Sequence, residues 1–88
     1  MNEYESEPAV AFVVLRPFVI RVMFADGLVR DVDLEKELRG PIFEPLKDPA
    51  YFAKAALDTG VVSWPNGADF APEFMYRAGR VIAEAQTA

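Results

Sequence analysis

The sequence predicts an α+β fold, a small antiparallel β-meander with short helical turns and one C-terminal helix. Two runs of β-branched and aromatic residues, 10–15 and 18–24, have the composition of strands. Glycine-closed bends at Asp26-Gly27 and at Pro65-Asn66-Gly67 are typical of antiparallel hairpins. A segment with helical spacing follows Pro72, a residue that suits the first position of a helix.

The length of the chain sets its domain organisation. A chain of 88 residues holds one hydrophobic core, so we expect a single α+β domain over residues 9–88. Residues 1–8 are polar and acidic and end in Pro8, which predicts a flexible acidic tail. This leader has three glutamates and no basic residue, and the apolar run after it is too short to span a bilayer. We therefore expect a cytoplasmic protein.

The register of the first hairpin follows from which residues it places opposite each other. A two-residue loop at the Asp-Gly pair would set apolar side chains against aspartates. A three-residue loop that ends at Gly27 instead pairs Ile20 with Val32, and Arg21 with Asp31. This register gathers apolar residues on one face and an opposite-charge pair on the other. We expect it, with Gly27 at a positive φ.

The middle of the chain predicts short helical turns. Asp33 can cap a short helix that Gly40 ends. The proline-containing stretch 41–52 is expected to be a looped segment pinned to the core by its apolar side chains. Within it, Asp48-Pro49 is a cap and first-position signal for one more turn of helix.

Two interpretations remain open for the alanine-rich residues 50–57. Their composition would allow the preceding helix to continue. Alternatively, residues 54–57 form a strand, residues 58–60 a turn, and residues 61–64 the antiparallel neighbour. We favour the hairpin.

The C-terminal helix is expected over residues 72–85. Pro72 stands at its first position, and Glu73 lies near the positive end of the helix dipole. Gly79 would cost this helix up to about 1 kcal/mol against alanine, and it suggests the close approach of another backbone. The apolar positions that share one helical face are Phe74, Ala78, Ile82 and Ala85.

The stretch SWPNGADFAPEFMY is the most strongly patterned part of the chain. Pro65, Asn66 and Gly67 suit successive positions of a tight turn, which predicts a three-residue loop with Trp64 opposite Ala68. A mechanical explanation therefore exists for most of the stretch. Asp69, on the face away from the tryptophan, could bond backbone amides at the start of the helix.

Four blocks occur in order along the chain: VMFADG followed by VDL, then FEPLKDPAYF, then WPNGADFAPEFMY. Over residues 18–76 this pattern resembles the small bacterial proteins classed as domain of unknown function 2442, although Met75 stands where the pattern usually has leucine. The resemblance implies an antiparallel meander and favours the second hairpin. It implies no established activity. Some relatives look like partners in toxin–antitoxin gene pairs, and some carry an added DNA-binding domain that we do not expect in this chain.

Composition excludes several kinds of function. The net charge is −5 and the isoelectric point about 4.6, without a basic stripe, so we expect neither nucleic-acid binding by this chain alone nor binding to an anionic membrane. The chain has no cysteine and no histidine, which removes disulfides, thiolate chemistry and the commonest general base and metal ligand. The sequence therefore predicts no cofactor and no metal site.

A hydrophobic content of 52% is high for so short a chain, so we expect some apolar side chains to face a partner. The sequence favours a non-enzymatic protein-interaction domain, with the antitoxin-like role implied by the resemblance as its most specific form. The acidic charge suits a basic protein partner, and a second copy of the chain, giving a homodimer, is the other partner considered. The candidate binding residues are Trp64, Asn66, Asp69, Phe70 and Tyr76, and the structural turn residues are Asp26, Gly27, Pro65 and Gly67.

The alternative is a small-ligand-binding or carboxylate-based catalytic domain. Asp31 and Asp33 alternate with Val32, so both carboxylates are expected on one face of a strand. Two carboxylates so placed could hold a hard cation or act as acid and base. They also suit a solvated strand face that discourages edge pairing. We assign no catalytic residue.

Overall fold

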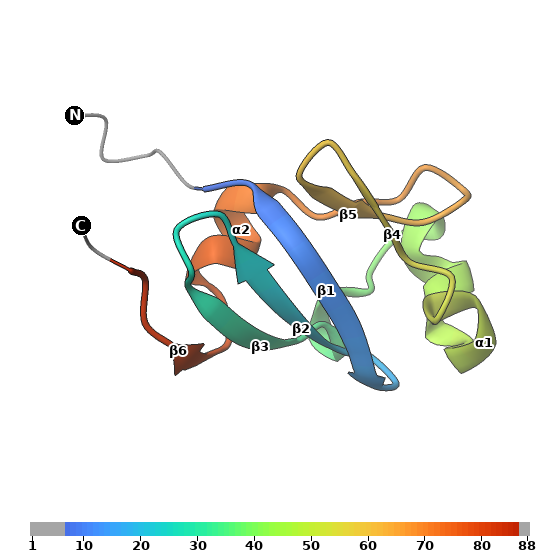
Figure 1. The fold of residues 1–88 in the computed structure, drawn as a ribbon. Helices are drawn as coiled ribbons and strands as arrows, with labels where there is room; N and C mark the ends of the chain where they lie inside the picture. Colours follow the sequence, from blue (N-terminus) through green and yellow to red (C-terminus); the bar gives the residue numbers. More distant parts are fainter. Residues whose placement is uncertain (1–6, 87–88) are drawn as a thin grey trace.

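The computed structural model describes residues 7–86, and its main feature is a four-stranded antiparallel sheet (Figure 1). The strands are β1 (Ala9–Arg16), β2 (Val19–Phe24), β3 (Val29–Asp33) and β6 (Arg80–Ala83). They lie in the order β1-β2-β3-β6, so the last strand of the chain pairs with the third. The α+β fold with a β-meander is thereby confirmed.

The β2–β3 hairpin has the predicted register. Ile20 pairs with Val32 and Arg21 with Asp31, and the residues at 25–27 form the loop. Gly27 has φ of 92°, in the region that glycine adopts without steric strain. The acidic tail expected at residues 1–8 lies outside the described residues except for its last two. Of these, Pro8 accepts a hydrogen bond from the main-chain nitrogen of this loop's first residue at 2.9 Å.

Short helices follow the meander. The helix expected between Asp33 and Gly40 is one 3-10 turn, η1 (Glu35–Glu37), whose start is held by a hydrogen bond from the Glu35 amide to the Asp33 carboxylate at 3.0 Å. A second 3-10 helix, η2 (Pro41–Lys47), leads to α1 (Pro49–Phe52). The Asp48 side chain caps α1 by accepting from the Ala50 amide, as its Asp-Pro signal predicts.

The hairpin between residues 54 and 64 is confirmed. Its strands are β4 (Ala56–Asp58) and β5 (Val61–Ser63), so the first strand begins later than expected and the helix does not extend into it. Asp58 pairs with Val61, which leaves a two-residue turn in which Thr59 and Gly60 both have positive φ, 52° and 83°. This conformation matches the twist of the flanking strands.

The C-terminal helix expected over residues 72–85 is wrong in extent. Helix α2 (Pro72–Arg77) ends after six residues, and the chain then enters β6. The reason is the free edge of β3, because Arg80 pairs with Asp31 and so satisfies backbone groups that a longer helix would leave open. Gly79 has φ of 74° and lies directly against the β3 backbone, which confirms the close approach its position suggested.

One face of the four-stranded sheet packs on the core, and we call it the inner face. Ile20, Val22, Phe24 and Val32 project from it and are buried together with side chains from β5, α1 and α2. These elements lie on one side of the sheet in Figure 1, where the β4–β5 hairpin and α1 extend beyond β1. The opposite face carries none of these elements.

Candidate functional site

Trp64 is part of the core. Only 3% of its surface is exposed, and its indole Nε1 donates a hydrogen bond to the main-chain carbonyl of Phe52 at 2.8 Å. The indole also meets the ring of Phe70 edge to face, with 5.9 Å between ring centroids. Burial and a satisfied indole N–H are what packing requires of a tryptophan. Trp64 is therefore not available on the surface to anchor a partner.

Asn66 fixes the second glycine-closed loop. Its side-chain oxygen accepts from the Ala68 amide at 3.1 Å, and its side-chain nitrogen donates to the carbonyl of Ile42 at 2.8 Å. Gly67 follows with φ of 91°, and the loop places Trp64 opposite Ala68 as predicted. Asn66 thus ties this loop to η2, and its amide is already engaged within the chain.

Phe70 and Asp69 lie on opposite sides of the extended segment after this loop. Phe70 is buried, and its ring stacks on those of Phe43 and Phe74 at centroid distances of 5.1 and 5.8 Å. Asp69 is exposed and bridges to Ser63 through the backbone, in the predicted register. Because Trp64 and Phe70 are both buried, the aromatic residues of this stretch do not make an exposed patch.

Tyr76 connects α2 to the loop at 25–27. Its hydroxyl donates to the Asp26 carboxylate, whose other oxygen accepts from the Leu28 amide, and its ring meets Phe24 edge to face. The hydrogen bond to Asp26, followed by burial, raises the pKa of Tyr76 to about 12. The structure thereby joins a predicted binding residue to a predicted turn residue, and both stabilise the fold.

The carboxylates of Asp31 and Asp33 lie on one face of β3, as alternation predicts, but each has a partner. Asp31 receives two hydrogen bonds from Arg21, at 2.7 and 3.0 Å, which hold the pKa of the Asp31 carboxyl below its usual value. Asp33 accepts from the Glu35 amide. Within residues 7–86 no group of three or more histidine, cysteine or acidic side chains is arranged to hold a metal ion.

Sequence reasoning missed the most distinctive surface of the molecule, the side of the four-stranded sheet turned away from the core. We call it the outer sheet face and define it by cross-strand rows. One row is apolar across all four strands and consists of Ala11, Met23, Val29 and Ala83. The next row consists of Val13, Arg21, Asp31 and Arg80. Arg16 and Asp33 complete the face at the border of the sheet.

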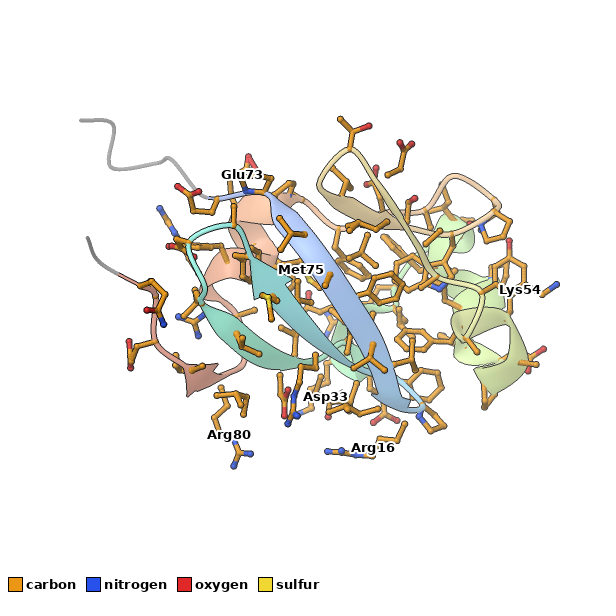
Figure 2. The ribbon with its side chains drawn as sticks, in the orientation of Figure 1. Arg16, Asp33, Lys54, Glu73, Met75 and Arg80 are labelled. Atoms are coloured by element: carbon orange, nitrogen blue, oxygen red, sulfur yellow. The ribbon has the colours of Figure 1, made fainter. Side chains whose placement is uncertain are left out.

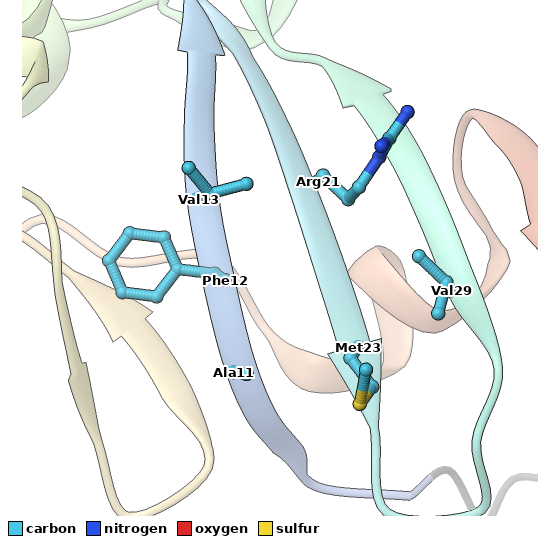
Figure 3. Close-up of a pocket in the computed structure, with 6 residues that line it drawn as sticks. All are labelled: Ala11, Phe12, Val13, Arg21, Met23 and Val29. Carbon is cyan, nitrogen blue, oxygen red and sulfur yellow. The ribbon is translucent and has the colours of Figure 1, made fainter.

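The apolar side chains of the outer sheet face are exposed to solvent. Val13 is 50% exposed and Met23 is 44% exposed. Figure 3 shows both side chains beside Arg21 and Val29, on three neighbouring strands, around a shallow hollow of about 190 Å³. Helix α2 passes behind the strands in this view. An antiparallel sheet with one solvated face usually carries polar residues there, and this face departs from that pattern.

A signal for this surface does exist in the sequence. The run Ala9-Val10-Ala11-Phe12-Val13-Val14-Leu15 is apolar at every position, whereas a strand with one solvated face alternates. A continuous run indicates that the strand has apolar side chains on both faces, which favours burial of both. Sequence analysis instead chose aromatic residues of the stretch 63–76 as candidate binding residues, because their spacing does not show whether they are buried.

The described elements define a class of protein, a small α+β domain in which a C-terminal strand is added to the edge of a three-stranded meander. This chain belongs to the family described as "Protein of unknown function (DUF2442)", whose pattern it matches over residues 9–81. The comparisons with curated proteins and with solved structures found no match. Within residues 7–86 no helix combines the length and the apolar character needed to cross a membrane.

Proposed function

We propose that this chain is a protein-interaction domain that acts without catalysis, and that the outer sheet face is its docking surface. The observation that carries the proposal is the apolar row across all four strands, with Met23 at its centre and 44% exposed. Contiguous apolar surface of this kind marks interaction sites, because its burial removes an unfavourable contact with water.

The polar groups of the face suit a docking role as well. Arg21 lies across the face with 42% of its side chain exposed, and Asp31 beneath it is 15% exposed. Because the two side chains already satisfy each other through two hydrogen bonds, a partner can cover them without leaving a buried charge unpaired. Arginine beside apolar residues is also a composition enriched at protein interfaces.

The alternative function, a small-ligand-binding or carboxylate-based catalytic domain, has less support. It would need acidic groups that converge on an enclosed cavity. Asp31 and Asp33 instead have partners from their own chain, and the hollow on the outer sheet face is shallow. The antitoxin-like role implied by the resemblance stays the most specific form of the proposal, and the cytoplasmic location expected from the sequence remains part of it.

A surface charge introduced at Met23 tests the proposal. Met23→Glu places a carboxylate in the apolar row, whereas Ile42→Glu places the same charge at another exposed apolar residue, 48% exposed, outside the sheet. Tagged wild-type chain should retain a specific protein from native lysate, and Met23→Glu should lose it while Ile42→Glu keeps it. Retention of the same protein by all three chains would refute the assignment of this face as the docking surface.

A further inference from the structure

We infer that the occupant of the outer sheet face is a second copy of this chain, packed face to face about a twofold axis. This inference rests on the proposed function, because it names the partner of the same surface. The sheet would then become one half of a two-layer sandwich, an arrangement in which the strands of two antiparallel sheets run within about 30° of each other.

The charge of the face is the first argument. The whole chain carries −5, so two copies repel each other over most of their surface. The outer sheet face differs, because three arginines and two aspartates give it a net charge of +1. Arg16, Asp33 and Arg80 lie along one border of the sheet in Figure 2. A strongly basic partner would meet these arginines, whereas a second copy brings both signs of charge.

The register of the face is the second argument. A twofold axis parallel to the strands, between β2 and β3, sets β2 of one copy over β3 of the other. The pairing of Met23 with Val29 and of Arg21 with Asp31 then repeats across the interface, since each pair is also a cross-strand neighbour within one copy. Apolar row meets apolar row, and Arg21 of each copy faces Asp31 of the other, while Arg80 lies over Val13. The face is therefore complementary to itself.

The size of the face sets the strength of the dimer. Four strands about 4.8 Å apart, with about five residues each at roughly 3.3 Å, cover roughly 300 Å² in projection on each copy. The surface buried by the side chains exceeds this flat area, yet it remains at or below the low end for stable complexes, about 1,200 Å² in total. The structure thus favours a weak, reversible dimer that forms at micromolar or higher concentrations.

Sedimentation equilibrium of the full chain tests the inference. From about 10 μM to about 1 mM, the mass should rise from 9.8 kDa toward twice that value, as a weak dimer requires. Met23→Glu should raise the dissociation constant by about tenfold or more, since two carboxylates would enter the apolar contact. Ile42→Glu is the matched control and should leave it unchanged. Circular dichroism of both variants verifies that they fold.

A crosslinking measurement gives an independent readout, and its cysteine variant keeps a small, uncharged side chain at position 23. The chain has no cysteine, so Met23→Cys and Ile42→Cys each carry a single thiol. A bismaleimide that spans about 10 Å matches the separation of two stacked sheets. It should join Met23→Cys chains into covalent dimers and leave Ile42→Cys chains mostly single.

The outcomes separate the inference from the proposed function. A wild-type chain that stays at 9.8 kDa throughout, or crosslinking that is equal for both cysteine variants, overturns the second copy as the occupant. If Met23→Glu nevertheless abolishes the retention of a different protein from lysate, the docking surface stands with another occupant. If the chain is monomeric and Met23→Glu changes no retention, both proposals are wrong.

Discussion

Substitution of Gly79 by alanine should weaken the pairing between β3 and β6. Gly79→Ala places an L-residue at φ of 74°, a conformation that costs roughly 1–2 kcal/mol. The new Cβ would also overlap with the main-chain carbonyl oxygen of Asp31 and lie 2.9 Å from the Cα of Val32. These are backbone atoms, so rotation of a side chain cannot relieve the overlap and β6 must move.

Gly67→Ala provides the matched control, because it adds the same methyl group at φ of 91° with no atom within 4 Å of the new Cβ. It should cost only the conformational strain, about 1 kcal/mol. Gly79→Ala should also weaken the β3–β6 pairing, where each hydrogen bond contributes about 1 kcal/mol, for a total of roughly 3 kcal/mol. The difference of about 2 kcal/mol corresponds to roughly 8–16 °C in Tm for a domain of this size.

Thermal unfolding followed by far-ultraviolet circular dichroism measures both variants, and urea unfolding gives the free energies independently. If Gly79→Ala and Gly67→Ala lower the Tm equally, the overlap with β3 has no energetic consequence. The explanation given above for the short helix α2 would then be wrong.

Two further predictions concern residues that sequence analysis had placed in a binding site. Trp64→Phe removes the indole hydrogen bond to the Phe52 carbonyl, which keeps only the longer one from the Ala55 amide at 3.3 Å, and it replaces a buried ring by a smaller one. It should destabilise the fold by about 1–3 kcal/mol in urea unfolding. The wild-type indole should emit at short wavelength and resist quenchers; red-shifted, quenchable emission would contradict its burial. Tyr76→Phe removes the hydrogen bond to Asp26 and should cost about 1 kcal/mol at neutral pH. Because the folded-state pKa of Tyr76 is raised from 10.0 to about 12, the wild-type chain should lose this advantage as the pH rises from 10 to 12, and a constant difference between the two chains over that range would refute the role of the hydroxyl.

Local signals predicted the turns and hairpins well. A three-residue loop that ends in glycine determines its own register, because only one alignment sets Arg21 against Asp31 and keeps apolar residues together. The same logic placed Trp64 opposite Ala68 around Gly67. In each case the residues that decide the geometry lie within ten positions of one another.

The end of the chain could not be predicted in the same way. Residues 80–83 form a strand because β3 offers them a free edge, and β3 is distant in sequence. The helical spacing after Pro72 extends to Ala85, but the helix itself is only six residues long, because pairing with the edge of β3 is the better alternative for residues 80–83. A local pattern carries no information about which distant backbone groups still lack hydrogen bonds.

The candidate site could not be predicted from local sequence patterns either. Alternation along a strand separates two faces but does not say which of them the rest of the chain will cover. Trp64 and Phe70 were candidate binding residues, yet both are buried in the core, while Met23 and Val13 are left facing solvent. Only the arrangement of the elements in space reveals that, among residues 7–86, one side of the sheet has no covering layer.

The pairing of Asp31 with Arg80 encloses more than half of the chain in a single closed loop. The three strands of the meander are neighbours along the polypeptide and assemble at little entropic cost, whereas β6 must wait until that loop has contracted. From this loop length we expect the four-residue strand to be the last part of the sheet to dock during folding and the first to separate when the domain opens. Its departure would uncover the edge of β3, so transient opening at this end adds an unpaired strand edge without global unfolding, beyond the sheet edge that β1 forms in the folded state.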